Sequence, residues 1–216
     1  MRVAVKICCI QSIDEARLAI EQGASAIGLV SAMPSGPGPI PEERIPEIAA
    51  AVPPAIATFL LTCLTHPVEL VAQHRRCGTR TIQFCDSIDH WTFERLREEL
   101  PGVALVQVIH VRGERSIDEA VAVAPYVDAI LLDSGNPSLS TKELGGTGRV
   151  HDWNLSRRIR DSVDVPLWLA GGLTPENVAR AVDIVQPHGV DVCSGLRPNG
   201  HLDRYRLEEF FAAVGA

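Results

Sequence analysis

Two side chains suited to acid–base chemistry follow predicted apolar strands. Cys8 comes directly after the apolar stretch 3–7, and Asp133 comes directly after the apolar stretch 129–132. A thiolate acts as a general base when its pKa approaches neutrality, and a carboxylic acid acts as a general acid when burial raises its pKa. Such a pair suits proton transfer at a carbon next to a carbonyl or an imine. The plainer explanations are that Cys8 is a small buried residue and that Asp133 caps the following loop. Spacing alone does not choose between these structural roles and the catalytic ones.

Glycine-rich turns after two later strands favour a phosphate site. Gly171 and Gly172 follow one predicted strand, and Ser194 and Gly195 follow the next. Glycines let backbone N–H groups approach an anion closely, and a serine hydroxyl adds one more donor. The Gly-Gly-Thr-Gly run that contains Gly146 offers further backbone donors or a mobile lid. Taken singly each glycine could serve only a turn, but the two matched positions together favour phosphate.

Eight short apolar stretches alternate with eight helical patterns along the chain. The predicted strands are residues 3–7, 26–30, 57–61, 81–84, 104–109, 129–132, 166–169 and 190–193. The predicted helices are residues 12–22, 41–51, 67–76, 92–100, 117–123, 154–161, 174–185 and 203–214. Ser12 with Glu15 three residues later is a capping-box pattern, and Thr174-Pro175 is typical of a helix start.

The strand pattern predicts the fold. The stretches are continuously apolar, as in parallel strands that are buried on both faces. Eight such units in 216 residues predict an α/β protein with one (β/α)8 TIM-barrel domain over residues 1–216. An open doubly wound sheet is the alternative, but no GxGxxG motif follows the first strand. In a barrel the carboxyl ends of all strands meet at one mouth, so Cys8 and Asp133 should face each other there.

Charge and hydropathy limit the partners. Lys and Arg number 20 against 27 Asp and Glu, a formal net charge of −7. This excess of acid argues against nucleic-acid binding, which needs basic residues to neutralise phosphates, but leaves room for one small anion. No apolar run is long enough to span a membrane, and no signal-peptide pattern opens the chain, so we expect a cytoplasmic protein. A monomer and a homodimer both remain open.

The cysteines raise the questions of disulfides and metals. There are six, at positions 8, 9, 63, 77, 85 and 193. In a cytoplasmic chain we expect them to be reduced. Several of them, with Asp86 and His110, fall near the predicted barrel mouth, where thiolates and an imidazole would suit zinc. No closely spaced ligand pair supports such a site, so we predict no metal and no cofactor.

Several segments, in order along the whole chain, resemble the phosphoribosylanthranilate isomerase family. They are Val5-Lys-Ile-Cys8 with Asp14-Glu-Ala, Gln22-Gly-Ala-Ser-Ala-Ile-Gly28, Asp128-Ala-Ile-Leu-Leu-Asp133, Gly145-Gly-Thr-Gly148 with Asp152-Trp153, Ala170-Gly-Gly-Leu-Thr-Pro-Glu-Asn177 and Gly189-Val-Asp-Val-Cys-Ser-Gly195. The resemblance is specific because the cysteine, the aspartate and both glycine turns match together.

The resemblance implies a (β/α)8 barrel that performs an Amadori rearrangement in tryptophan biosynthesis without a cofactor. An aminoaldose phosphate becomes a 1-amino-1-deoxyketose phosphate. Asp133 would protonate the furanose oxygen, and Cys8 would remove the proton from C2′. The phosphate would lie against the glycine turns already described. Five further residues are expected near the substrate: Lys6, Gln83, Asp86, His110 and Arg149.

The chain departs from the family pattern at the amine end of the expected site. Cys9 stands where a glycine is usual, and Cys85-Asp86 replaces a His-Gly pair. The loop 31–40 has no Lys or Arg, where the family usually has an arginine for the anthranilate carboxylate. Two hypotheses follow: the enzyme acts on a different amine or sugar phosphate, or Arg112, Arg149 or Lys142 supplies the cation from another loop. A non-catalytic paralogue that binds a phosphorylated ligand is a third, and His151 is a further candidate near the mouth.

Overall fold

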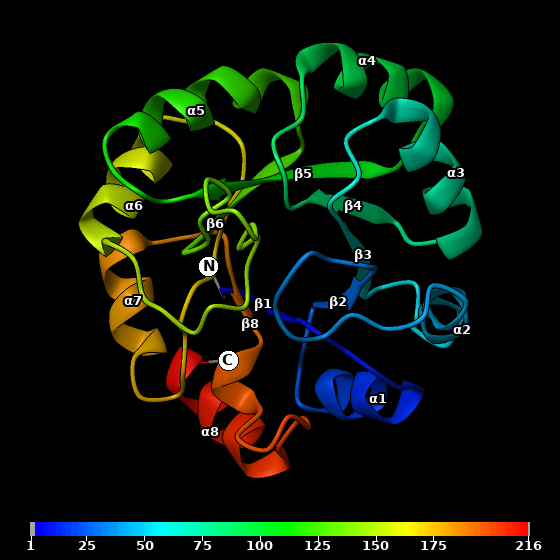
Figure 1. Ribbon diagram of the computed structural model, residues 1–216. Coiled ribbons are helices and arrows are strands. Elements are labelled where there is room, and N and C mark those ends of the chain that lie inside the picture. Colours follow the sequence, from blue (N-terminus) through cyan, green and yellow to red (C-terminus); the bar gives the residue numbers. More distant parts are fainter. Residues whose placement is uncertain (1–2, 216) are drawn as a thin grey trace.

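The computed structural model describes residues 3–215. Within them, eight parallel strands pair in chain order and the last pairs with the first, so the sheet closes into a barrel. Helices surround this barrel on the outside (Figure 1). The predicted (β/α)8 barrel is therefore confirmed.

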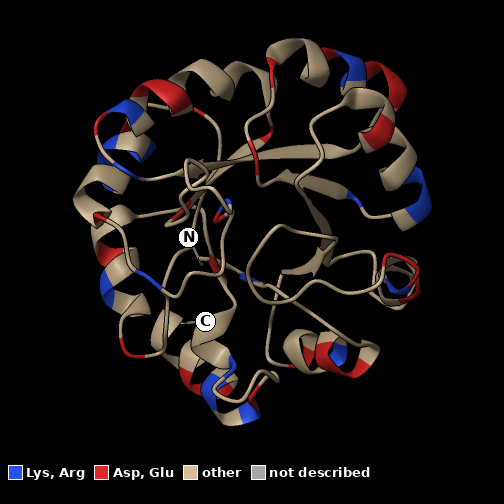
Figure 2. Ribbon diagram, viewed as in Figure 1, with Lys and Arg blue, Asp and Glu red and all other residues tan. Residues whose placement is uncertain are grey.

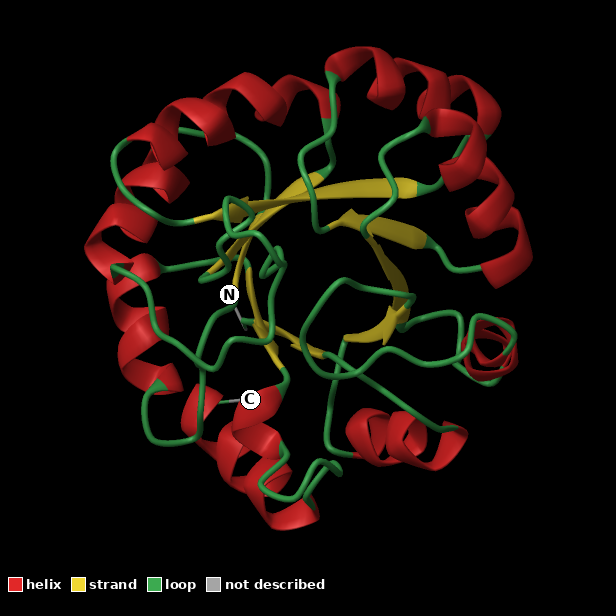
Figure 3. Cartoon of the chain, viewed as in Figure 1, coloured by secondary structure: helices red, strands yellow, loops and turns green. Residues whose placement is uncertain are grey.

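The strands begin and end within one residue of their predicted bounds. They are β1 (Ala4–Ile7), β2 (Ala26–Val30), β3 (Ala57–Thr62), β4 (Thr81–Phe84), β5 (Ala104–His110), β6 (Ala129–Asp133), β7 (Leu167–Leu169) and β8 (Gly189–Val192). Figure 3 shows them as an inner yellow ring inside the red helices. Alternate strand residues pack outward on the helices or inward on one another, which explains the continuous apolar runs.

The helices follow the predicted order, and their starts differ most. They are α1 (Ile13–Glu21), α2 (Arg44–Ala50), α3 (Pro67–Cys77), α4 (His90–Glu99), α5 (Arg115–Val123), α6 (Trp153–Asp161), α7 (Val178–Val185) and α8 (Arg204–Val214). Two short 3-10 turns, η1 (Ala124–Tyr126) and η2 (Ser194–Leu196), were not predicted. Lys, Arg, Asp and Glu lie mainly on the outer helices (Figure 2), as expected for their solvated faces.

The helix signals were partly right. Ser12 caps α1 as predicted, because its side chain accepts a hydrogen bond from the Glu15 N–H. The prediction that a helix begins at Thr174 was wrong, since α7 begins four residues later. Asn177 explains the delay: its side chain accepts from the Thr174 N–H and donates to the Gly172 carbonyl. It folds the segment into a turn that supports the glycines after β7.

The prediction of six reduced cysteines was wrong for two of them. Cys9 and Cys193 form a disulfide, with their Cα atoms 5.9 Å apart. They are 184 residues apart in sequence, but closure of the barrel pairs β1 with β8 and brings them together. Cys8, Cys63, Cys77 and Cys85 are free thiols.

The described residues contain neither a helix suited to a membrane nor a cluster suited to a metal ion. None of the helices between residues 3 and 215 has the length and apolar character needed to cross a membrane. Over the same residues, no group of three or more His, Cys, Asp or Glu side chains is arranged to hold a metal ion.

Candidate active site

A cavity opens at the carboxyl ends of the strands. Its volume is about 690 Å³, counting the open mouth, and loops after β2, β6, β7 and β8 contribute to its wall. The predicted site residues that line it are Cys8, Gln83, Asp133, Gly146, Gly171, Gly172 and Ser194. The barrel therefore brings together the thiol, the carboxyl and the glycine turns that the sequence spread over nearly two hundred residues.

Cys8 lies at the floor of the cavity, where it is 6% exposed. Burial raises the pKa of its thiol to about 11, and the Asp191 carboxylate acts in the same direction. The Lys6 ammonium and the Cys9 backbone N–H partly offset this rise, because both favour the thiolate. The resting thiol is therefore protonated at neutral pH, with two groups in place to stabilise its anion.

Lys6 is fully buried beneath Cys8. Its Nζ lies 2.8 Å from Asp191 Oδ2 and 5.1 Å from the centre of the Phe59 ring. Burial lowers the pKa of Lys6, but Asp191 and the neighbouring Cys8 outweigh that effect and the pKa is raised overall. Lys6 thus stays charged under the cavity floor, although it does not line the cavity itself.

Asp191 is a functional candidate that the sequence analysis missed. It lines the cavity beside Cys8 and pairs with Lys6 in strand register across the β1–β8 seam. A signal was available: a charged residue inside a buried strand requires a charged partner, and Lys6 occupies the same kind of position in β1. Only closure of the barrel shows that the two strands are neighbours.

The charges around Cys8 should determine how fast its thiol is alkylated at each pH. In a Cys63→Ser background, which removes the half-exposed free thiol, alkylation of Cys8 by iodoacetamide should rise about tenfold per pH unit between pH 7 and 10. Lys6→Met should slow the reaction at each pH, because loss of the ammonium raises the thiol pKa further. The rate at Cys8 is read by peptide mass spectrometry. A rate that levels off near pH 8 would contradict the assigned environment.

Gly28 in β2 leaves room for this cluster. A Cβ at this position would lie 2.8 Å from Cys8 Sγ and 3.1 Å from Lys6 Nζ. Gly28→Ala should therefore displace the thiol, lowering kcat at least tenfold, with a stability cost of about 1–3 kcal/mol. Ala129→Val is the matched control, because it overpacks the barrel interior at the start of β6, beside a pocket whose lining does not include Cys8. Thermal melts and kcat are compared, and equal loss of kcat in both variants would contradict the prediction.

Asp133 ends β6 and is 8% exposed. Its Oδ1 accepts a 2.7 Å hydrogen bond from the Ser134 N–H. A Cβ at Gly145 would lie 2.8 Å from Oδ2, and one at Gly171 would lie 3.2 Å from Oδ1. The two glycines therefore keep the space around this carboxyl open to a ligand.

The predicted phosphate corner has glycine at positions where loops touch. Gly171 and Gly172 have left-handed backbones, with φ of +85° and +63°. A Cβ at Gly172 would lie 2.6 Å from the Arg149 backbone, and one at Gly195 would lie 2.0 Å from the Leu173 carbonyl oxygen. Gly195 is outside the cavity lining, and its absent side chain lets the β8 loop pack against the β7 loop. Ser194 and Gly146 line the cavity beside them.

The two histidines near the mouth lie outside the cavity lining. His110 is buried, its Nε2 donates to the Cys85 carbonyl oxygen at 3.0 Å, and its Nδ1 packs against Gly135. His151 interacts through Nε2 with the Ala170 carbonyl oxygen and through Nδ1 with the Ser156 hydroxyl. Burial lowers the pKa of His151, so its ring is neutral and supports the end of β7.

The remaining predicted site residues lie at the rim. Asp86 pairs with Lys142, Arg149 pairs with Glu143, and neither Asp86 nor Arg149 is part of the cavity lining. Lys142 belongs to the loop after β6, which meets the loop after β2 where the Ser35 hydroxyl donates to the Lys142 carbonyl oxygen. In the part of the chain that the structure describes, no Lys, Arg or His side chain lines the cavity.

Gln83 carries an unpaired group into the cavity. It is 3% exposed and lines the wall, and within residues 3–215 its Oε1 has no hydrogen-bond partner. A buried amide oxygen without a partner is costly, and a ligand hydroxyl or N–H removes that cost. Gln83 Oε1 is therefore one polar group that the arrangement leaves free for a ligand, and Asp191 Oδ1 in the same lining is another.

Comparisons with known proteins agree with this geometry. The family model described as N-(5′-phosphoribosyl)anthranilate (PRA) isomerase matches residues 5–213. The chain is 34% identical over 211 residues to the N-(5′-phosphoribosyl)anthranilate isomerase of Methanocella arvoryzae, covering 97% of each chain. It is 36% identical over 215 residues to the isomerase of Haloferax volcanii, covering 97% of this chain and 92% of the relative.

Solved structures show the same relationship. The phosphoribosyl anthranilate isomerase of Thermococcus kodakaraensis superimposes with a TM-score of 0.80 at 30% identity, over 98% of each chain. A phosphoribosyl anthranilate isomerase solved with reduced 1-(o-carboxyphenylamino)-1-deoxyribulose 5-phosphate gives a TM-score of 0.79 at 26% identity, over 99% of this chain and 98% of that one. The match runs through every strand that carries a residue of the cavity. The chain therefore belongs to the N-(5′-phosphoribosyl)anthranilate isomerase family.

Proposed function

We propose that this enzyme isomerises N-(5′-phosphoribosyl)anthranilate to 1-(o-carboxyphenylamino)-1-deoxyribulose 5-phosphate, a step of tryptophan biosynthesis. One observation carries the proposal: a buried thiol and a carboxyl line the same cavity, whose edge is a glycine-rich turn suited to phosphate. A thiol and a carboxyl in one cavity supply the base and the acid that an Amadori rearrangement needs.

The proposed reaction begins at Asp133. Its protonated carboxyl gives a proton to the furanose ring oxygen, the C1′–O bond breaks, and the nitrogen lone pair forms an iminium with C1′. The Cys8 thiol first releases its proton to solvent. The resulting thiolate removes the proton from C2′, and the C–H electrons move toward the iminium nitrogen to give an enolamine. Tautomerisation of the enolamine places a proton on C1′ and leaves a ketone at C2′. The iminium is the electron sink, so the proposed route uses no cofactor.

The surrounding groups support these two transfers. Lys6, held by Asp191, stabilises the thiolate as Cys8 prepares to take the proton. Backbone N–H groups at the turns after β7 and β8, with the Ser194 hydroxyl, hold the phosphate end. The unpaired Gln83 oxygen accepts from a sugar hydroxyl or from the amine N–H.

Lys142 is the proposed cation for the anthranilate carboxylate. It stands at the rim next to Ser35, which lines the cavity. In the described residues the ammonium group of Lys142 pairs with Asp86 alone. Lys142→Ala should raise KM for the carboxylated substrate about tenfold, because one charge-assisted contact is lost, with kcat little changed. Arg112→Ala is the control, since Arg112 already donates to Asn136 and Ser138 away from the cavity. Equal KM values in the two variants would show that a group other than Lys142 binds the anthranilate carboxylate.

A different amine or sugar phosphate is the second candidate. The observation that favours it is the absence of Lys, Arg and His from the cavity lining in the described residues. A substrate whose amine bears no carboxylate fits such a lining without a cation.

The deciding experiment measures turnover of phosphoribosylanthranilate generated in situ, followed by loss of its fluorescence. Turnover by the wild-type enzyme supports the proposed reaction. A folded protein that binds ribose 5-phosphate but shows no turnover contradicts it and favours the second candidate, which is then tested with other aminoaldose phosphates. Binding without turnover of any of them would indicate a non-catalytic paralogue.

A further inference from the structure

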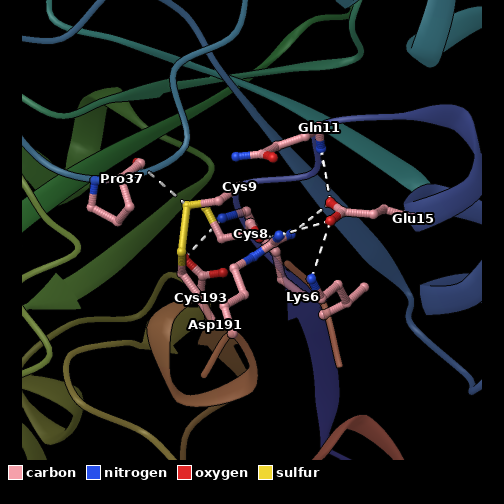
Figure 4. Close-up of a disulfide and its surroundings, with 10 residues drawn as sticks. Lys6, Cys8, Cys9, Gln11, Glu15, Pro37, Asp191 and Cys193 are labelled. Atoms are coloured by element: carbon pink, nitrogen blue, oxygen red, sulfur yellow. Dashed lines mark hydrogen bonds and ion pairs between the residues drawn. A yellow bond between two sulfur atoms is a disulfide. The ribbon is translucent and has the colours of Figure 1, made fainter. Parts of the chain in front are cut away.

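The Cys9–Cys193 disulfide lies next to Cys8 and Asp191 (Figure 4). Cys9 adjoins Cys8 in sequence, Cys193 adjoins Ser194, and all four residues line the cavity. We propose that this disulfide is a positioning element of the active site, which holds the Cys9 backbone N–H against the Cys8 sulfur and the Ser194 turn against the phosphate. The inference rests on the proposed function and adds to it a pair of residues with no part in the reaction itself.

The backbone at Cys9 shows why a covalent tie matters there. Cys9 has φ of +60°, a left-handed conformation that favours glycine and costs energy for residues with a side chain. Among the described residues, Cys9 and Gln186 are the two non-glycine residues with positive φ. The bond to Cys193 restrains Cys9 in this conformation, which the side chain by itself disfavours.

This conformation directs a donor at the proposed base. The backbone N–H of Cys9 lies near the Cys8 sulfur and favours its thiolate, which lowers the pKa of that thiol. The hydrogen-bonded seam of β1 and β8 ends where the Cys8 N–H donates to the Val192 carbonyl oxygen, 2.9 Å away. The disulfide joins the next residue of each segment, Cys9 after β1 and Cys193 after β8. It therefore restrains the adjacent residues Cys8 and Ser194.

The loop after β2 packs directly on the disulfide. A Cβ at Gly38 would lie 2.6 Å from Cys9 Cβ and 2.7 Å from Cys9 Sγ, and the Cys9 sulfur lies 3.7 Å from the Pro37 carbonyl oxygen. Pro37 in turn contacts Gly146, in the loop after β6. The disulfide therefore supports both loops that cover the cavity mouth.

The Cys9–Cys193 disulfide can be reduced by a dithiol. Dithiothreitol reduces it by thiol–disulfide exchange: the S–S bond between Cys9 and Cys193 breaks, each sulfur receives a proton from a reagent thiol, and the reagent closes to its cyclic disulfide. Two electrons pass from the reagent to the protein. Reduction frees Cys9 to leave the left-handed region and loosens the Ser194 turn.

The first test establishes the bond without reference to activity. Thiols are titrated in denaturant on protein purified without reductant, and non-reducing peptide mass spectrometry identifies the linked pair. Four free thiols and a Cys9–Cys193 peptide are expected, since the other four cysteines are free. Six free thiols would overturn the proposal.

The second test separates positioning from mere stability. Oxidised wild type, reduced wild type, Cys9→Gly and Cys193→Ser are compared, and Cys63→Ser controls for the accessible thiol. Opening the disulfide should raise KM for the phosphorylated substrate roughly fivefold. It should also slow alkylation of Cys8 and lower kcat by a similar factor, because the thiolate loses the support of the Cys9 N–H. Cys9→Gly suits the left-handed backbone and keeps the fold while the bond is absent.

The outcomes are distinguishable from failure of the proposed function. A lower melting temperature with unchanged KM and unchanged Cys8 alkylation would show a purely structural bond and overturn the proposal. If the oxidised enzyme holds the bond but has no turnover, the proposed reaction fails. The positioning role of the disulfide is then tested by the affinity of the protein for inorganic phosphate. Weaker phosphate binding after reduction supports this role, and equal binding overturns it.

Discussion

Cys8→Ser should lower kcat for phosphoribosylanthranilate by about 10³–10⁴-fold and leave the affinity for ribose 5-phosphate within about twofold. The serine hydroxyl fills nearly the same space but ionises far less readily than a thiol, so the base is lost while the cavity wall is kept. The proposed phosphate corner lies in the loops after β7 and β8 and does not include the sulfur. Steady-state kinetics and ligand titration measure the two quantities on the same preparation.

Cys85→Ser is the matched control for this variant. Cys85 is also a free, buried cysteine of the cavity wall, and burial raises the pKa of its thiol far above the usual range. Unlike Cys8, it has no role in the proposed reaction, and its replacement should lower kcat less than about tenfold. Comparable losses in the two variants would show that Cys8 acts through packing, and would contradict its assignment as the base.

Asp133→Asn should lower kcat by about 10²–10⁴-fold, because an amide cannot protonate the ring oxygen. The amide keeps the shape of the carboxyl, and its oxygen still accepts the 2.7 Å hydrogen bond from the Ser134 N–H, so the β6 loop stays in place. The loss should therefore appear in kcat with little change in the melting temperature. Circular dichroism melts and steady-state kinetics provide the comparison.

Asp86→Asn is the control for the second carboxyl at the mouth. Asp86 pairs with Lys142 at the rim and lies outside the cavity lining. Removing its charge frees Lys142, so KM should fall or stay constant and kcat should remain near the wild-type value. A kcat for Asp133→Asn as high as that of Asp86→Asn would remove Asp133 from the proposed mechanism.

The strands were predictable because their chemistry is local. Both faces of a strand in a closed barrel are buried, so each strand is a short continuous apolar stretch bounded by polar turns. The resulting ring order brings the residues after β1, β4, β6, β7 and β8 to one mouth. Cys8, Asp133 and the paired glycine turns could therefore be assigned to one cavity before any side chain was placed.

Other features depend on contacts between distant segments. The start of α7 moved because Asn177 bonds to Gly172, a contact that the helix signals at Thr174 do not contain. The expectation of reduced cysteines came from the cellular compartment, which says nothing of distance. Closure of β8 against β1 brought Cys9 and Cys193 together.

The sequence by itself thus determined the barrel and the residue types that gather at its mouth, since apolar periodicity and strand order suffice for both. Only the tertiary structure decided which side chains share an environment: Lys6 with Asp191 under Cys8, the Cys9–Cys193 disulfide beside Ser194, and His110 and Arg149 outside the cavity lining. The physical reason is that burial, ion pairing and side-chain direction depend on neighbours across the barrel, whereas strand and helix formation depend mainly on neighbours along the chain.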